Sequence, residues 1–399
     1  MRISTSAIYD ANVSILNQQQ SRLLHTQEQL ATGRRMLTPS DDPIASARAL
    51  DVSQADALNT QYDTNRNVAR SNYSLADGNM QSVVDLLQYV RERAVQAGGA
   101  ISAANRQAIG ADLAIRMDEL KGLANTTDGQ GNYLFSGYQG KTVPFVGTAA
   151  GVQYQGDDGQ RMVQVSGSRQ LAASDSGADV FMRIKNGNGT FVTQAAAGNT
   201  GSGLVAQGVV TNPAALTGDS YRVNFNVVAG VTTYDIVDTT TATTLSAGNA
   251  YTSGNAISFA GMQISVSGAP ANGDSFTTAP SSNESLFKTL ADLVASLNAA
   301  GSSTNTQTLN SINKALGQLD NGLSKVLSVR ASVGARMNEI DSLKTAGDDL
   351  GLSFKSTLSQ LQDVDYNQGV SDMNQQQVAL QAAQKTFKQV SDMSLFNYI

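Results

Sequence analysis

The stretch from Ile312 to Ile340, INKALGQLDNGLSKVLSVRASVGARMNEI, repeats apolar residues at alternating steps of four and three. Such steps place side chains on one face of an α-helix, in the heptad pattern of helices that pack along their length. The sequence therefore predicts a long helix packed against a second one. We call the repeating positions the rod seam: Ile312, Leu316, Leu319, Leu323, Val326, Arg330, Val333, Met337 and Ile340.

Arg330 is the single charged member of the rod seam. A charge at such a position is either neutralised by an ion pair within the subunit or sets the register between neighbouring rods. The rest of the seam is apolar enough to pack within one subunit, so we expect it to be the core of the bundle and not a surface between subunits.

Toward the C-terminus the same register continues to Leu361, which predicts a helix of about 55 residues. The stretch from Lys344 to Gly351 is unusually polar and predicts a loosened part of this helix. A last helix, from about residue 369 to 393, carries Met373, Leu380 and Phe387 on one stripe and is rich in glutamine.

The N-terminal part mirrors this arrangement. A first helix from Ile8 to about Gly33 carries Leu16, Leu23 and Leu30 at steps of seven, again among glutamines. A long helix then runs from Ile44 to about Gln96, and a shorter one from about residue 105 to 125. Leu16, Leu23, Leu30, Met373, Leu380 and Phe387 are the expected assembly interface, here called the terminal seam.

The turn before the long helix holds Pro39, Ser40, Asp41, Asp42 and Pro43. Ser and Asp side chains cap helix N-termini, and proline fits the first helical turn. Asp41 and Asp42 could instead be paired carboxylates for acid–base chemistry, but helix capping and the helix dipole explain them better.

The middle of the chain changes in composition. Residues 143–282 are rich in Thr, Val, Ser, Gly and Asn and poor in charge, and alternating runs such as 221–227, 233–237 and 262–266 predict half-buried strands between Gly-rich turns. Two short strands are also expected around residues 133–135. The predicted fold is a mainly α rod, a long antiparallel helical bundle from both chain ends, with an inserted β-rich domain.

This layout predicts three parts. Residues 1–37 and 367–399 are the terminal helices, 38–142 and 283–366 form the helical rod with a small hairpin, and 143–282 form the β-rich outer domain. The terminal seam offers little apolar surface, and its burial does not offset about 1–2 kcal/mol of backbone ordering per residue. We therefore expect the terminal helices to be disordered in the free monomer and to fold on assembly.

Composition excludes several function classes. A net charge of −6 with no cluster of Lys or Arg argues against a nucleic-acid coat. The chain has no cysteine and a single histidine, His25, so neither a thiolate site nor a catalytic or metal centre is expected, and no cofactor or metal. No stretch predicts a cleaved signal peptide or a membrane span.

Several motifs resemble the flagellin-related family of flagellar hook-associated proteins, including those of the junction between hook and filament. They are the segments 30–35 (LATGRR), 38–43 (TPSDDP), 88–96, 123–126, 131–137, 330–336 (RASVGAR), 363–366 (DVDY) and 394–399 (SLFNYI). The resemblance covers about residues 1–140 and 283–399. The β insertion matches nothing functional.

The resemblance implies a non-enzymatic, extracellular adaptor of the bacterial flagellum, needed for filament attachment and motility and exported unfolded without a cleaved signal. Its implied partners are further copies of itself in a ring, a neighbouring hook-associated protein, flagellin, and an export chaperone on the C-terminal helix. Two alternatives remain open: a flagellin that builds the filament itself, and a secreted adhesin or hydrolase carried on the β insertion.

Overall fold

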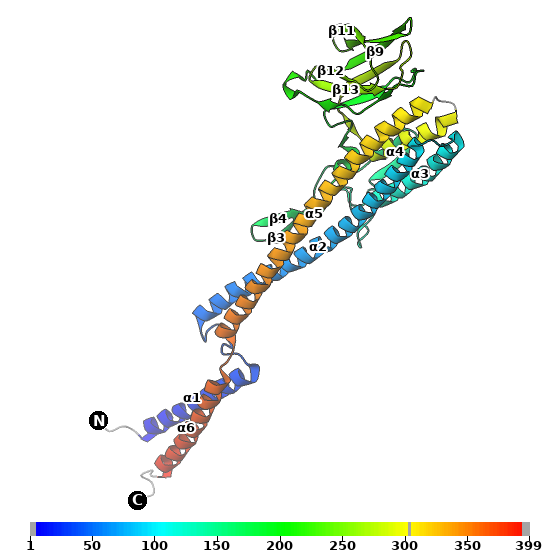
Figure 1. Ribbon diagram of the computed structural model, residues 1–399. Coiled ribbons are helices and arrows are strands. Elements are labelled where there is room, and N and C mark those ends of the chain that lie inside the picture. The colour runs from blue at the N-terminus through cyan, green and yellow to red at the C-terminus, as the bar shows by residue number, and fades with distance from the viewer. Residues whose placement is uncertain (1–4, 302–304, 393–399) are drawn as a thin grey trace, which may run out of the picture. The chain divides into compact units, whose positions relative to one another are not determined.

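The computed structural model describes residues 5–301 and 305–392 (Figure 1). The chain divides into two compact units, which are described separately. Unit 1 comprises Met1–Thr64 and Ser342–Ile399, and unit 2 comprises Asn65–Asp341. The segment 394–399, which carries part of the resemblance, lies outside the described residues.

The helices follow the sequence pattern closely. They are α1 (Thr5–Thr32), α2 (Pro43–Gly98), α3 (Ala103–Ala124), α4 (Leu286–Asn298), α5 (Asn305–Gln362) and α6 (Tyr366–Asp392), with the short helices η1 (Ala178–Met182), η2 (Pro213–Ala215) and η3 (Ala299–Gly301). Gly33, at a φ of +70°, follows the end of α1 in a conformation that disfavours other residues. The predicted mainly helical fold with a β insertion is confirmed.

In unit 1, α1 packs against α6, and the adjoining parts of α2 and α5 lie antiparallel. Asn59 donates to the carbonyl of Gly347 at 2.7 Å, and Lys344 pairs with Asp63 at 3.2 Å. The polar stretch from Lys344 to Gly351 does not interrupt α5, so the expectation of a loosened helix there is wrong. In this stretch, where α5 lacks large apolar seam residues, polar contacts such as that between Lys344 and Asp63 join α5 to α2 instead.

In unit 2, α2 and α5 again lie antiparallel, as two ion pairs between them show. Arg70 pairs with Asp341 at 2.7 Å, and Arg91 pairs with Asp320 at 2.6 Å. Alternate members of the rod seam are no more than 1% exposed: Ile312, Leu319, Val326, Val333 and Ile340. The members between them are half-buried: Leu316, Leu323, Arg330 and Met337. The fully buried members of the rod seam thus lie in the core of the helical bundle, and the half-buried members lie at the boundary between this core and solvent.

The β insertion forms two main sheets. One has the order β11-β10-β9-β14-β6, and the other has β12-β13-β7 with β8 also paired to β13. Their strands are β6 (Phe191–Ala195), β7 (Leu204–Val205), β8 (Val209–Val210), β9 (Tyr221–Val228), β10 (Val231–Asp238), β11 (Thr243–Ala250), β12 (Ala256–Phe259), β13 (Met262–Ser267) and β14 (Ser275–Pro280). All their pairings are antiparallel.

The two sheets share one apolar core. From Tyr221 to Phe225, strand β9 is buried at every second residue, which matches the alternation expected of a strand with one face inside. The core gathers Phe191, Val205, Tyr221, Val223, Phe225, Ile236, Ile257, Phe259, Met262, Ile264, Val266 and Phe276. The predicted strands at 221–227, 233–237 and 262–266 are therefore confirmed as β9, β10 and β13.

Smaller strand pairs join the insertion to the helices. They are β1 (Phe145–Thr148) with β2 (Gly151–Tyr154), β3 (Met162–Ser166) with β4 (Arg169–Ala172), and β5 (Ile184–Lys185) with β15 (Asn283–Glu284). The second predicted rod segment starts at Asn283, but that residue belongs to strand β15 and not to a helix. Helix α4 starts at Leu286, where the Ser285 hydroxyl accepts the N–H of Lys288 at 3.0 Å.

The predicted strands around residues 133–135 are wrong. This segment forms turns, with only one isolated bridge between Thr127 and Tyr133. Phe135 is buried and packs edge-on against Phe181 at 5.3 Å, while its carbonyl accepts the Tyr154 hydroxyl at 2.9 Å. Hydrogen bonds and side-chain packing with distant segments thus hold residues 133–135 in place. Their apolar side chains are buried although the segment does not pair as a strand.

Candidate assembly interface

The terminal helices form a pair within unit 1. The rings of Tyr9 in α1 and Phe387 in α6 lie 5.2 Å apart, and the Leu30 side chain rests against Gly369. A Cβ on Gly369 would approach Leu30 Cδ2 to 2.8 Å, so the glycine permits this close approach of the two helices. The helices that the sequence singled out from opposite ends of the chain are thus brought together.

The terminal seam is only partly covered by this pairing. Its six members are all half-buried: Leu16, Leu23, Leu30, Met373, Leu380 and Phe387. Unit 1 also leaves a further set of large apolar side chains exposed, none of which belongs to the terminal seam. These residues, here called the outer apolar set, are Tyr9, Ile15, Leu24, Ile44, Leu50, Leu58, Leu350, Leu352, Tyr366, Val370 and Val378.

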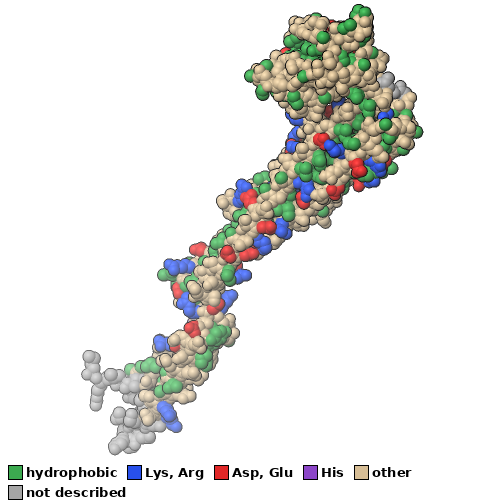
Figure 2. Space-filling model, in the orientation of Figure 1, with side chains coloured by type: hydrophobic (Ala, Val, Ile, Leu, Met, Phe, Trp, Pro, Cys, Tyr) green, Lys and Arg blue, Asp and Glu red, His purple; other side chains and the backbone are tan. Residues whose placement is uncertain are grey.

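The outer apolar set is a strong indication of contact with other chains. Single exposed apolar residues are common on soluble proteins, but Ile44, Leu50 and Leu352 are each at least 70% exposed and lie on the same unit. Figure 2 shows apolar side chains among polar ones on the face that it draws. The rod seam and the terminal seam do not include these residues, because the members chosen for a heptad seam cover only part of each helix surface.

The segments that connect the terminal helices to α2 and α5 are tied to each other by backbone hydrogen bonds. The N–H of Arg35 donates to the carbonyl of Gln362 at 2.7 Å, and the N–H of Val364 donates to the carbonyl of Gly33 at 2.9 Å. The Arg35 guanidinium adds a bond to the carbonyl of Leu361 at 3.0 Å. This linker pairing was not predicted, because single short bridges leave no periodic pattern in a sequence.

The helix-start turn is organised by its two aspartates. Asp42 Oδ1 accepts the N–H of Ala45 at 3.0 Å and so caps α2, whose first residue is Pro43. Asp41 instead accepts the N–H groups of Thr38 and Leu37 at 2.9 and 2.8 Å. These two bonds lower the pKa of Asp41 from 3.8 to about 2.

The remaining turn residues are exposed, and Ser40 shares a hydrogen bond with the Thr38 hydroxyl at 2.7 Å. Pro39 is likewise exposed. His25 Nε2 lies 3.5 Å from Asp41 Oδ1, which links α1 to the turn. The two aspartates therefore serve separate structural tasks, and nothing in their bonding resembles a carboxylate pair that shares a proton.

Asp365 caps the N-terminus of α6, as Asp42 caps that of α2. Asp365 was not identified as a cap from the sequence pattern. Its Oδ1 accepts the N–H groups of Asn367 and Gln368 at 2.9 and 3.2 Å. An aspartate directly before a helical pattern is a recognisable start signal, so this cap could have been found from the sequence.

Arg330 in the rod seam forms an ion pair within unit 2. Its Nε and Nη2 atoms lie 2.9 and 3.3 Å from the two carboxylate oxygens of Asp77, and Nη1 donates to Gln81. Of the two alternatives for this charge, the structure therefore shows the ion pair between α5 and α2. A two-pronged contact of this kind also fixes the register of the two helices.

The described residues include no group of three His, Asp or Glu side chains that could hold a metal ion. Nor does any helix among them combine the length and apolar character that a membrane crossing requires.

Comparison with known proteins assigns this architecture. Residues 3–140 match the family model of the bacterial flagellin N-terminal helical region, and residues 316–399 match that of the C-terminal helical region. The chain is 30% identical to flagellar hook-associated protein 3 of Salmonella typhimurium over 99% of both chains. It belongs to the flagellar hook-associated protein 3 family. The protein of the same name from Escherichia coli is 28% identical, again over 99% of both chains.

Solved structures of the same family share the fold. Flagellar hook associated protein-3 from Legionella pneumophila matches with a TM-score of 0.73 and 33% identity, over 78% of this chain and 98% of that one. FlgL from Xanthomonas campestris gives 0.71 and 32%, over 77% and 99%. Flagellin E of Vibrio cholerae is 33% identical, but over only 35% of this chain and 37% of its own length.

Proposed function

We propose that this chain is the structural adaptor that joins the hook of the bacterial flagellum to its filament and that filament attachment and motility require it. The observation that carries the proposal is the full-length match to flagellar hook-associated protein 3, which spans the β insertion as well as both helical ends. A solved relative is itself described as the flagellar junction protein from Legionella pneumophila, 32% identical over 79% of this chain.

The flagellin alternative has less support. Flagellin E of Vibrio cholerae and polar flagellin C of Vibrio parahaemolyticus match over only 35% and 34% of this chain. A strain in which the gene is deleted separates these alternatives. Loss of a junction adaptor leaves hooks without filaments and releases flagellin into the medium, which electron microscopy and immunoblotting detect. Filaments that remain attached in the deletion strain would refute the adaptor role.

The outer apolar set supports assembly through unit 1. We infer that copies of the chain form a ring, with a neighbouring hook-associated protein on one side and flagellin on the other. A purified-component assay tests this order: the protein should first bind the preceding hook-associated protein and then nucleate flagellin. Nucleation by the preceding protein alone would exclude the adaptor role.

We also infer that the role is non-enzymatic and extracellular, with export in an unfolded state and a chaperone on the C-terminal helix. The half-buried terminal seam supports export in an unfolded state. Helices that bury so little of each other's surface gain little free energy from pairing in the isolated chain. The terminal helices should therefore be disordered in the free monomer and ordered in the ring.

Hydrogen exchange on the soluble monomer tests the folding of the terminal helices. Amides in 5–32 and 366–392 should exchange at nearly unfolded rates in the monomer and become protected in the assembled ring. Strong protection of both helices in dilute monomer would contradict this inference while leaving the adaptor role intact.

A further inference from the structure

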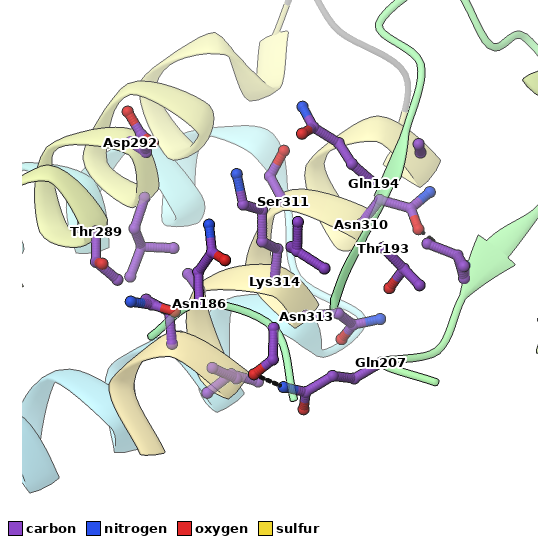
Figure 3. Close-up of a pocket in the computed structure, with 18 of the residues that line it drawn as sticks. Asn186, Thr193, Gln194, Gln207, Thr289, Asp292, Asn310, Ser311, Asn313 and Lys314 are labelled. Atoms are coloured by element: carbon purple, nitrogen blue, oxygen red, sulfur yellow. Dashed lines mark hydrogen bonds between the residues drawn. The ribbon is translucent and has the colours of Figure 1, made fainter. Parts of the chain in front are cut away.

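A cavity of about 660 Å³ lies in unit 2 where the β insertion meets α4 and α5 (Figure 3). Asn310 in its wall accepts the N–H of Val205 and donates to the carbonyl of Gly203, both at 3.0 Å. These bonds attach the β insertion to α5, so the wall of the cavity has a structural task.

In unit 1, the two linkers that lead to the terminal helices are joined to each other. Residues 33–42 connect α1 to α2, and residues 363–365 connect α5 to α6. Arg34 and Asp363 form an isolated antiparallel bridge, with a backbone hydrogen bond on each side of it. We call this arrangement the linker clasp, and its residues are Gly33, Arg34, Arg35, Gln362, Asp363 and Val364.

The linker clasp places the ends of the two terminal helices next to each other. Helix α1 ends at Thr32 and α6 begins at Tyr366, so only a few residues separate the bridge from either helix. With the clasp open, the linker 33–42 tethers α1 to α2, and a flexible linker of that length lets α1 sample a wide volume. Closing the clasp removes this freedom and so raises the effective concentration of α1 at α6.

The packing between the two helices is tight beside the clasp. A Cβ on Gly33 would approach the Tyr366 hydroxyl to 3.1 Å, and the Leu30 side chain rests against Gly369. Among the described side chains of α1 and α6, Thr26 and Gly369 alone are buried, and both lie toward the clasp. The contacts that stabilise the pair are therefore concentrated at this end.

Away from the clasp the same pair is loosely packed. The rings of Tyr9 and Phe387 lie 5.2 Å apart near the chain ends, but Tyr9 remains 53% exposed. Val378 of α6 is 66% exposed. Because burial of apolar surface is the main favourable term in packing, the pairing of α1 with α6 is most favourable beside the clasp and weakens toward the chain ends.

We propose that the linker clasp is a conformational switch for the terminal helices. It is open in the free monomer and closes on assembly, and α1 and α6 then pair outward from it toward the chain ends. This proposal rests on the inference above that the terminal helices are disordered in the free monomer.

The outer apolar set explains how assembly would close the clasp. Two backbone hydrogen bonds are a weak restraint in an isolated chain, since the open linkers bond to water instead. Leu24, Tyr366 and Val370 of the outer apolar set lie in the parts of α1 and α6 that are near the clasp, and they are 44–57% exposed. A neighbouring copy that covers these side chains therefore stabilises the closed clasp.

A disulfide across the bridge tests the switch, because the chain has no cysteine of its own. Arg34 and Asp363 form the non-hydrogen-bonded kind of antiparallel pair, whose Cα atoms lie about 4.5 Å apart, and a disulfide spans that distance. In the variant Arg34→Cys with Asp363→Cys, oxidation locks the clasp and reduction reopens it. Amides of 5–32 and 366–392 should exchange at least about tenfold more slowly in the oxidised monomer, most strongly near Leu30 and Gly369.

The same experiment can overturn the switch in two ways. Equal exchange in the oxidised and reduced monomers would do so, and so would a variant that forms no disulfide within one chain. Full protection already in the reduced monomer would instead refute the disorder on which the switch rests, and would leave the adaptor role intact.

A shifted pair, Thr38→Cys with Asp363→Cys, is the control for register. It joins the same two linkers away from the bridge and should slow the exchange of the terminal helices less than the matched pair does. An equal effect would show that any connection between the linkers suffices, and this would overturn the role of the bridge.

A proline variant opens the clasp without a cross-link. Val364→Pro removes the N–H that donates to Gly33, whereas Val364→Ala keeps it. In the purified-component assay, Val364→Pro should need at least about tenfold more protein than the parent to form the ring, and Val364→Ala about as much as the parent. Unchanged hydrogen exchange of residues 65–341 shows that both variants are folded. Ring formation by Val364→Pro at the parent's concentration overturns the proposal.

Discussion

At the scale of single residues, Asp41 makes the helix-start turn sensitive to acid. Its pKa falls from 3.8 to about 2 because the carboxylate accepts the N–H groups of Thr38 and Leu37. A lowered folded-state pKa stabilises the turn fully above pH 4, and this contribution is lost as the pH falls through about 2. The carboxyl ¹³C resonance of Asp41 should therefore titrate near pH 2.

Asp41→Asn is the matched change for this titration. The variant should lose the acid-dependent part of amide protection at Thr38 and Leu37 between pH 4 and pH 2, while the Asp42 cap on Ala45 remains. A titration midpoint of the parent at the ordinary value of 3.8 would show that the two backbone bonds do not persist in solution.

Arg330 offers a second prediction at this scale. Its bond to Asp77 is partly exposed, so we expect a coupling free energy of about 1 kcal/mol in a double-mutant cycle of Arg330→Met and Asp77→Asn. Urea denaturation of the monomer measures it. Zero coupling in the monomer together with failed assembly of Arg330→Met would instead indicate that the arginine acts between subunits.

At the scale of elements, the rod seam should show a graded response to truncation. Ile340 on α5 is fully buried, whereas Met337 is only half-buried. Ile340→Ala should lower the free energy of unfolding by about 3 kcal/mol, through lost apolar contact and the cavity left behind. Met337→Ala should cost about 1 kcal/mol, because part of its side chain is already in water. Equal losses at the two positions would contradict the assignment of core and border.

The elements also show what the sequence can and cannot predict. Helices α2 and α5 were predictable because each is a long amphipathic pattern with recognisable caps or breakers at its ends. Strand order was not: β14 lies between β9 and β6, and its partner β6 is about 80 residues away in the chain, so no local signal encodes the pairing.

The same limit applies to the sites. The terminal seam and the helix-start turn could be identified because their residues are periodic or adjacent in sequence. The linker pairing at Arg35 and Val364 could not, because its two segments come from opposite ends of the chain and single hydrogen bonds leave no periodic pattern.

At the scale of the whole molecule, we expect the terminal helices to serve assembly and unit 2 to provide the stable fold, which leads to a prediction about truncation. We propose that removal of residues 1–37 and 367–399 leaves the rod and the β domain folded but abolishes assembly. The terminal helices contact each other through a half-buried seam, whereas the cores of unit 2, around Val333 in the bundle and Phe225 in the β domain, are fully buried.

The truncated chain should therefore keep the protection of residues 65–341 in hydrogen exchange and the main thermal transition of the full chain, yet fail to restore filaments in a deletion strain. A matched control is the full chain with Leu316→Ala, a half-buried seam position in unit 2, which should be slightly less stable but should still assemble. Loss of the main transition on truncation would mean that the terminal helices stabilise the monomer. Restored filaments would mean instead that assembly depends on other surfaces. The two failures are distinct because stability and assembly are read separately.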